Sequence, residues 1–398
     1  MVTASWNSLT NADCMRCEVV PSSDEDAQLT KDALLSTLHA FQQQRHEDWT
    51  TMVEEFDQND LEQRLQKPLL ERARERANKE PIIGSTIECN FDKIILSIFD
   101  EVQYWEKFPE RDQFQIPSQA LSICCQRESL RLVREKVMVL VRHYNDLLSD
   151  LSDEESHLFS DHLRLVEKKI NPGFSKLNWS SRPVLLERYA QACTTQILET
   201  SGIVKIYHSR QRKILSNCNN IGSFLLIKID KNESYSDGSF ETQQIKHRAE
   251  ATNIFHVSHT RIKKEMDIIF SDFKEGSKEV INEWTKLLSS TNATIENALR
   301  ENIKQSLKVL SQAINGASSA QHDQTTLFLV RVILDHNGVS CRPSMIDLTH
   351  AVNNITKELI GTIRNIPRLE SDSLTHPTTD QTLPSFYDMI SSNKIILK

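Results

Sequence analysis

Glycine is scarce in this sequence, and no two glycines lie close together. Only 9 of the 398 residues are glycine, and none is followed by lysine. A phosphate-binding loop needs closely spaced glycines followed by Lys-Ser or Lys-Thr at the start of a helix. The sequence therefore predicts no nucleotide-binding loop in this segment. Little glycine with abundant Glu, Gln, Lys, Arg and Leu also favours helix over sheet.

An excess of positive charge and long apolar runs are also missing. The formal net charge is −8, which argues against a general nucleic-acid or anionic-membrane surface. The longest apolar run, at 224–227, is far shorter than the roughly 20 residues that cross a bilayer. The first residues do not resemble a signal peptide. We therefore expect a soluble, intracellular protein with no nucleic-acid and no membrane partner.

Reactive side chains are present, but their spacing does not form a recognisable site. Cys14 and Cys17 have metal or redox spacing, yet a structural zinc site needs a second ligand pair at a suitable distance, and the next cysteine is Cys89. His256 and His259 could share a metal on one helix face, but no carboxylate or cysteine completes the set. We predict no catalytic, cofactor-binding or metal-binding residue, no cofactor, and reduced thiols throughout.

Two other reactive or charged stretches have simpler interpretations. Cys124 and Cys125 are adjacent on a predicted helix, where neighbours point about 100° apart, so one of them is expected to be buried. The charged run at 71–76 is interpreted as a solvated helix face with i,i+4 ion pairs rather than a binding patch.

The apolar pattern divides the chain into a polar leader and two helical regions. We predict a flexible leader at 1–30, a helical bundle region at 31–230, a second helical region with a short strand or hairpin at 239–370, and a linker with the start of a further helix at 371–398. Apolar periodicity predicts helices at 31–78, 91–108, 121–148, 153–170, 181–216, 241–271, 275–316 and 343–363. Alternation at 325–335, followed by His-Asn-Gly, predicts the strand.

A few large side chains are expected to act as structural anchors. Trp105 shares a stripe with Ile98 and Val102, which indicates core packing. Gly173 is expected to supply a backbone conformation that other residues resist, so that Trp179 docks back on the preceding elements. Near the start of the chain, apolar residues recur at helical spacing: Leu34, Leu35, Leu38, Phe41, Trp49, Met52, Val53 and Phe56.

The order of these anchors resembles the N-terminal tail region of dynein heavy chains, especially the axonemal ones. The stretches that carry this resemblance are Asn90-Phe91-Asp92, Glu101–Trp105, Tyr144-Asn145 and Pro172–Ser180. Similarity continues downstream through Glu296–Ile314, Leu327–Val330, Arg342-Pro343-Ser344 and Ile360–Leu369. The resemblance spans about Asn90 to Leu369.

The resemblance implies a mainly α fold, an elongated stack of helical bundles with one short β element near residues 325–341. It implies a non-catalytic tail that associates with a partner dynein heavy chain, dynein intermediate and light chains and axonemal docking components, in the cytoplasm, the cytoskeleton and the cilium axoneme. Full-length heavy chains continue into AAA+ modules, so a fragment is expected. Two alternatives are part of a minus-end-directed motor ATPase whose AAA+ region is missing, and an unrelated helical scaffold or tether.

Overall fold

The computed structural model describes residues 24–56, 58–73, 85–108, 114–229, 237–315, 330–335, 338–370 and 384–392. Several predicted features lie outside these residues: residues 1–23 of the leader predicted at 1–30, the Cys14 and Cys17 pair, residues 371–383 of the predicted linker, and the first half of the predicted strand. Residues 24–30 of the predicted leader are helical.

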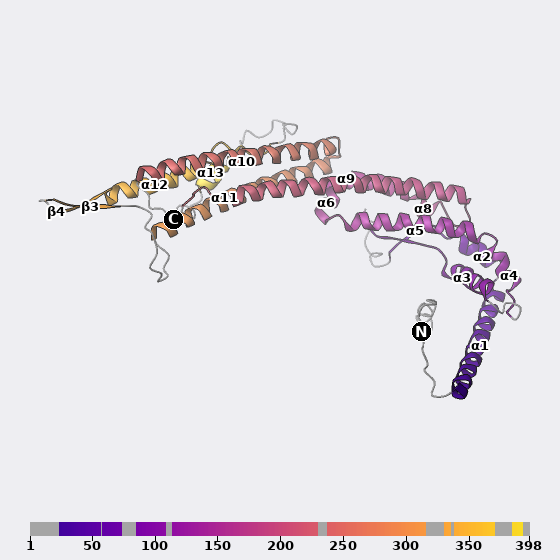
Figure 1. Ribbon diagram of the computed structural model, residues 1–398. Helices are drawn as coiled ribbons and strands as arrows, with labels where there is room; N and C mark the ends of the chain where they lie inside the picture. Colours follow the sequence, from indigo (N-terminus) through magenta and orange to yellow (C-terminus); the bar gives the residue numbers. More distant parts are fainter. Residues whose placement is uncertain are drawn as a thin grey trace. The chain divides into compact units, whose positions relative to one another are not determined.

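Helices dominate the described residues, which confirms the predicted mainly α class (Figure 1). The helices are α1 (Asp24–Glu54), α2 (Gln58–Leu65), α3 (Lys93–Lys107), α4 (Ser118–Cys124), α5 (Arg127–Ser149), α6 (Asp153–Leu158), α7 (Ser160–Ile170), α8 (Pro172–Ser175), α9 (Pro183–Ser223), α10 (Asp237–Phe273), α11 (Lys278–Asn315), α12 (Met345–Gly361) and α13 (Phe386–Ser391). Two antiparallel pairs are formed by β1 (Leu70–Arg72) with β2 (Ile87–Cys89), and by β3 (Arg331–Asp335) with β4 (Gly338–Arg342). Within the described ranges, no helix combines the length and apolar character needed to cross a bilayer.

The chain divides into two compact units, and each is described here by itself. Unit 1 is drawn from Met1–Arg74, Ile87–Val141 and Ile170–Ala192. Unit 2 is drawn from Glu75–Thr86, Arg142–Lys169 and Cys193–Lys398, so α5 and α9 contribute residues to both. The domain boundaries expected from the sequence stay predictions.

The core of unit 1 is built around α3, which packs on α4. Buried side chains recur along α3 at spacings of three and four, at Ile95, Ile98, Val102 and Trp105. This confirms the predicted apolar stripe. Removing each such side chain from water contributes about 1.5–3 kcal/mol to the free energy of unfolding.

The core of unit 2 lies among its long helices. Figure 1 shows α10 and α11 side by side, with α12 against both. The side chains buried on α10 and α11 include Phe255, Ile262, Met266, Ile269, Phe273, Trp284, Ile295, Leu299 and Ile303. Both helices begin and end close to their predicted bounds, because apolar periodicity over ten turns is a strong signal.

Two stretches predicted as single helices are interrupted. The predicted helix at 121–148 is divided into α4 and α5 at Cys125 and Gln126, where the Cys125 N–H bonds the Ser122 carbonyl in a tight final turn. The predicted helix at 153–170 is divided at Phe159 into α6 and α7. Phe159 is buried between the Tyr207 and Phe273 rings. The helix is thus interrupted at the residue whose ring packs between two other rings, and the apolar periodicity of the sequence does not reveal this interruption.

The charged run at 71–76 is not a helix face where the structure describes it. Glu71 and Arg72 lie in β1, paired with β2, and the Arg72 guanidinium lies 5.0 Å from the Phe174 ring centroid. The predicted helix through residue 78 is therefore wrong at 70–72. A strand partner nearly twenty residues away overrides the local helical preference of Glu and Arg.

Buried amide side chains hold extended backbone in unit 2. Gln244 accepts a hydrogen bond from the Lys228 N–H and donates one to the Lys228 carbonyl oxygen. Asn292 does the same for Leu369, at 2.9 Å and 3.0 Å. Buried backbone groups outside helices need such partners, so these two amides fix where the segments before α10 and after α12 lie.

Two buried histidines lie in the same unit. His162 contacts the Phe159 and Phe273 rings, and burial lowers the pKa of its imidazole. Burial also lowers the pKa of His259, whose ring bonds the Pro367 backbone. The His259 Nε2 atom has no partner among the described residues. Protonating it would place an unpaired charged N–H in the core.

We expect unit 2 to lose stability as the pH falls below about 6.5. The unfolded chain takes up protons as pH falls through 6.5, the ordinary pKa, while both folded imidazoles stay neutral. Stability is thus full above 6.5 and is lost as pH falls toward the folded pKa values, by up to about 1.4 kcal/mol per histidine and pH unit. Urea unfolding followed by circular dichroism measures this slope. A double variant, His162→Gln with His259→Gln, should flatten it, and an unchanged slope would contradict the assignment.

Candidate functional site

Three separate stretches of the chain meet in a corner of unit 1. β1 and β2 pair in register, and Pro68 forms an isolated bridge with Asn178. Backbone hydrogen bonds extend this pairing, from the Leu69 N–H to the Leu177 carbonyl oxygen and from the Ser180 N–H to the Leu65 carbonyl oxygen. Residues near 68, 88 and 178 therefore form one connected backbone network, which the sequence did not predict.

Trp179 connects the stretches of the corner, as predicted for a structural anchor. Its side chain is 2% exposed, and its Nε1–H donates a 2.8 Å hydrogen bond to the Asn90 carbonyl oxygen. The Phe91 ring meets the indole edge-to-face at 4.7 Å between centroids, the geometry that aromatic quadrupoles favour. The indole thereby joins Asn90-Phe91-Asp92 to Pro172–Ser180, two of the stretches on which the family resemblance rests.

Asp92 fixes the start of α3 next to this corner. Its carboxylate accepts a 2.9 Å hydrogen bond from the Ile94 N–H, a 2.7 Å bond from Lys67 Nζ and a 3.1 Å bond from Arg64 Nη1. Burial acts to raise the pKa of this carboxyl, but the bonds from Lys67, Ile94 and Arg64 outweigh it and hold the pKa below its ordinary value. The negative charge of Asp92 therefore connects the end of α2 to the N-terminus of α3, and negative charge is favoured at a helix N-terminus.

Gly173 is required by close approach and not by an unusual backbone conformation. It lies inside α8 without a positive φ, so the predicted special conformation is wrong. A Cβ at this position would lie 2.3 Å from Tyr189 Oη and 2.9 Å from Leu70 Cδ1. Tyr189 Oη donates a hydrogen bond to the Ile170 carbonyl oxygen and cannot move away without losing it.

Trp105 forms the centre of a second aromatic group in unit 1. It is fully buried, with ring centroids of His46 and Phe114 each 5.0 Å away. An ion pair between Arg45 and Glu101, at 2.6 Å, joins α1 to α3 beside it. The second half of α1 is thus attached to the core, and the core role predicted for Trp105 is confirmed.

The first half of α1 carries an uncovered apolar stripe. Leu34, Leu38 and Phe41 recur at spacings of four and three, and together with Leu35 they are about half exposed. Trp49 and Val53, further along the same helix, are buried. The amphipathic face predicted from the sequence is present, but unit 1 covers only part of it. Contiguous exposed apolar surface of this kind marks an interaction site.

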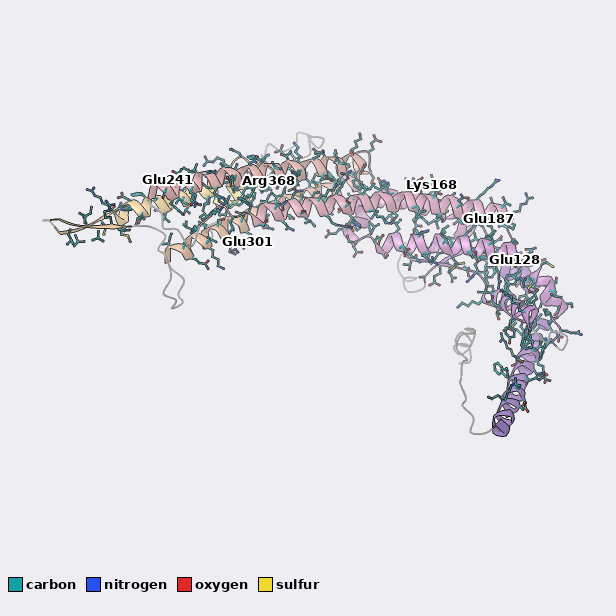
Figure 2. The ribbon with its side chains drawn as sticks, in the orientation of Figure 1. Glu128, Lys168, Glu187, Glu241, Glu301 and Arg368 are labelled. Carbon is teal, nitrogen blue, oxygen red and sulfur yellow. The ribbon has the colours of Figure 1, made fainter. Side chains whose placement is uncertain are left out.

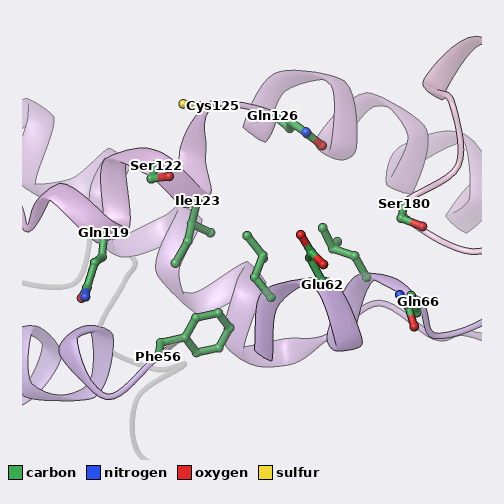
Figure 3. A pocket seen from close by; sticks show the side chains of 11 residues that line it. Phe56, Glu62, Gln66, Gln119, Ser122, Ile123, Cys125, Gln126 and Ser180 are labelled. Carbon is green, nitrogen blue, oxygen red and sulfur yellow. The ribbon is translucent and has the colours of Figure 1, made fainter. Parts of the chain in front are cut away.

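A groove of about 670 Å³ opens between α2 and α4 of unit 1 (Figure 3). Phe56, Leu65 and Ile123 supply apolar, buried side chains, and Glu62 is its carboxylate. The other side chains around it are Leu61, Gln66, Gln119, Ser122, Cys125, Gln126 and Ser180. Apolar side chains inside a polar rim fit a partner's side chain better than a phosphate or metal.

Three cysteines that the structure describes have thiols with a raised pKa. Burial raises the pKa of the Cys89, Cys124 and Cys218 thiols to about 11, so they are protonated and weakly nucleophilic at neutral pH. Within the part of the chain that the structure describes, no group of three or more His, Cys, Asp and Glu side chains could hold a metal ion.

Comparisons with known proteins place this corner in a family. The family model of the dynein heavy chain N-terminal region 1 matches residues 19–189, which contain all of the corner. Dynein-1-beta heavy chain of the flagellar inner arm I1 complex, from Chlamydomonas reinhardtii, is 28% identical over 359 residues, or 88% of this chain. Human dynein axonemal heavy chain 2 is 29% identical over 323 residues, or 80% of this chain. Over most of its length, the chain is similar to axonemal dynein heavy chains.

The chain spans 8% and 7% of the length of these two relatives. The resemblance seen in the sequence from Asn90 to Leu369 is therefore confirmed. What the sequence did not reveal is the groove and the β1–β2 pair. Two short alternating stretches on either side of Pro81 and Gly84 were the signal for that pair.

Proposed function

We propose that this dynein tail segment is a non-catalytic assembly module. It binds a partner heavy chain, intermediate and light chains and axonemal docking components, and so holds the motor in the cilium axoneme. The observation that carries the proposal is the match to the N-terminal region of axonemal heavy chains. The absence of a phosphate-binding sequence motif supports assigning ATP hydrolysis to residues outside this segment.

The α1 stripe is the surface we assign to the partner heavy chain. Leu34, Leu38 and Phe41 have the spacing with which one helix packs along another. The groove beside α2 and α4 offers a second contact, with buried apolar side chains and a polar rim suited to an intermediate or light chain. The intermediate chain's propeller domain is the partner we expect there.

Affinity capture from a ciliary salt extract tests this function. The tagged 398-residue chain should enrich a dynein heavy chain together with intermediate and light chains, identified by mass spectrometry. Replacing Leu34, Leu38 and Phe41 by serine should reduce heavy-chain recovery about tenfold. The phosphate released from ATP by the same preparation should not exceed the buffer background.

The matched control changes apolar side chains of similar exposure elsewhere in unit 1. Val184→Ser with Leu185→Ser, at the start of α9, should leave capture unchanged. Recovery of no dynein subunit by the unaltered chain, or ATP turnover above background, would contradict the proposal. An equal loss of heavy-chain recovery in the two variants would show that the α1 surface is not the binding site of the partner heavy chain.

A further inference from the structure

The β3–β4 hairpin of unit 2 projects beyond the start of α12 (Figure 1). Its register pairs Arg331 with Arg342 and Ile333 with Ser340 on one face. Val332 with Cys341 and Leu334 with Val339 alternate onto the other face. Among the residues that the structure describes, each strand has one partner. Alternate N–H and C=O groups on both outer edges therefore point away from the pair.

One face of this hairpin is apolar and uncovered. Leu334 is 83% exposed, Val339 68% and Val332 60%, and Cys341 beside them is also exposed. An isolated two-stranded hairpin is marginally stable in water, and a third strand or a packed apolar face is what stabilises one. An exposed strand edge whose neighbouring side chains are apolar and uncharged readily pairs with a strand of another chain.

The opposite face carries two arginines directly across from each other. Like charges at facing positions destabilise an antiparallel pair. Neither Arg331 nor Arg342 forms an ion pair with another described residue. The nearby carboxylate of Asp347 instead accepts hydrogen bonds from the Ser344 backbone and hydroxyl in the capping box of α12.

We propose that this hairpin accepts a third strand from a partner protein in which apolar and carboxylate side chains alternate. Strand addition pairs one of the two outer edges, and the two-residue period places apolar side chains on the same face as Leu334 and Val339. The same period places carboxylates beside Arg331 and Arg342, where they offset the repulsion. The proposal is independent of the α1 surface, because the triple serine variant of α1 leaves this hairpin unchanged.

Figure 2 shows acidic side chains such as Glu241 and Glu301 on the long helices of this unit. The net charge of the chain is −8, so general attraction of an acidic peptide is disfavoured. Any preference for such a peptide must come from a local basic site. Comparing peptides of opposite charge therefore tests whether such a local basic site is present.

The probes are three short fluorescent peptides. One alternates glutamate and valine, one alternates lysine and valine, and one has the composition of the first with its valines and glutamates in separate blocks. Binding to the whole chain is followed by anisotropy, and by the alkylation rate of Cys341 read by mass spectrometry. The exposed Cys125 of unit 1 is the internal control. We expect the alternating acidic peptide to bind about tenfold more tightly than the others and to slow alkylation of Cys341 alone.

Two variants decide the charge and the apolar contributions separately. Arg331→Glu with Arg342→Glu should reverse the preference toward the lysine peptide, whereas Arg182→Glu with Arg212→Glu, the same charge change at exposed positions elsewhere, should not. Leu334→Ser with Val339→Ser keeps the arginines and should weaken binding. Equal binding of all peptides, no binding, or no reversal would overturn the proposal. A dimer in sedimentation that the serine variant dissociates would assign the face to a second copy and overturn it too.

Discussion

Replacing Trp179 by alanine should lower the free energy of unfolding of unit 1 by about 3–5 kcal/mol. The indole is 2% exposed and packs edge-to-face with Phe91. Its removal leaves a cavity where the corner stretches meet. It also leaves the Asn90 carbonyl oxygen without its indole donor, and an unpaired buried acceptor adds to the cost. A loss of this size is a large fraction of the stability of a typical domain.

Native-state hydrogen exchange of the α3 peptide, Lys93–Lys107, measures this loss within unit 1. Trp179→Phe separates the two causes, because phenylalanine keeps most of the ring volume but has no N–H, and should cost about 1–2 kcal/mol. Val184→Ala, at an exposed position, should change stability by less than about 0.5 kcal/mol. An alanine variant no less stable than this control would show that Trp179 is not an anchor.

Replacing Asn302 by leucine should destabilise unit 2 by about 2–4 kcal/mol. Asn302 is fully buried on α11, and its Nδ2 lies 2.8 Å from the Ile221 carbonyl oxygen and 2.5 Å from that of Phe224. A longer contact of 3.5 Å reaches the Gly222 carbonyl oxygen. Leucine has the same branching and the same number of heavy atoms but no donor, so these acceptors at the end of α9 would lose their partner in a dry environment.

Urea unfolding and hydrogen exchange of the 221–229 peptide test this prediction. The matched control is Asn297→Leu, an exposed asparagine on the same helix, which should be nearly neutral. Ser306 supports the same segment by accepting the Leu226 N–H at 2.9 Å, so exchange should increase most at 221–225. Equal effects of the two leucine variants would refute the role of Asn302.

Local periodicity predicted the elements whose apolar positions repeat over several turns. The stripe of α3 and the long helices α10 and α11 all follow from rules that use a single stretch of sequence. Capping boxes at Ser152 and Ser344 begin α6 and α12 where the sequence pattern placed helix starts. The order of anchors was enough to identify the family, since it does not depend on how the anchors pack.

Tertiary structure decided everything that depends on a distant partner. Glu71 and Arg72 are strand residues because β2 pairs with them, and Gly173 is small because Tyr189 approaches it. Leu38 and Val53 are both apolar residues of α1, yet only Val53 is covered. A sequence determines which residues prefer to leave water, through the chemistry of each side chain. Which of these residues are buried depends on surfaces formed by residues distant in the sequence, and those surfaces exist only in the folded protein.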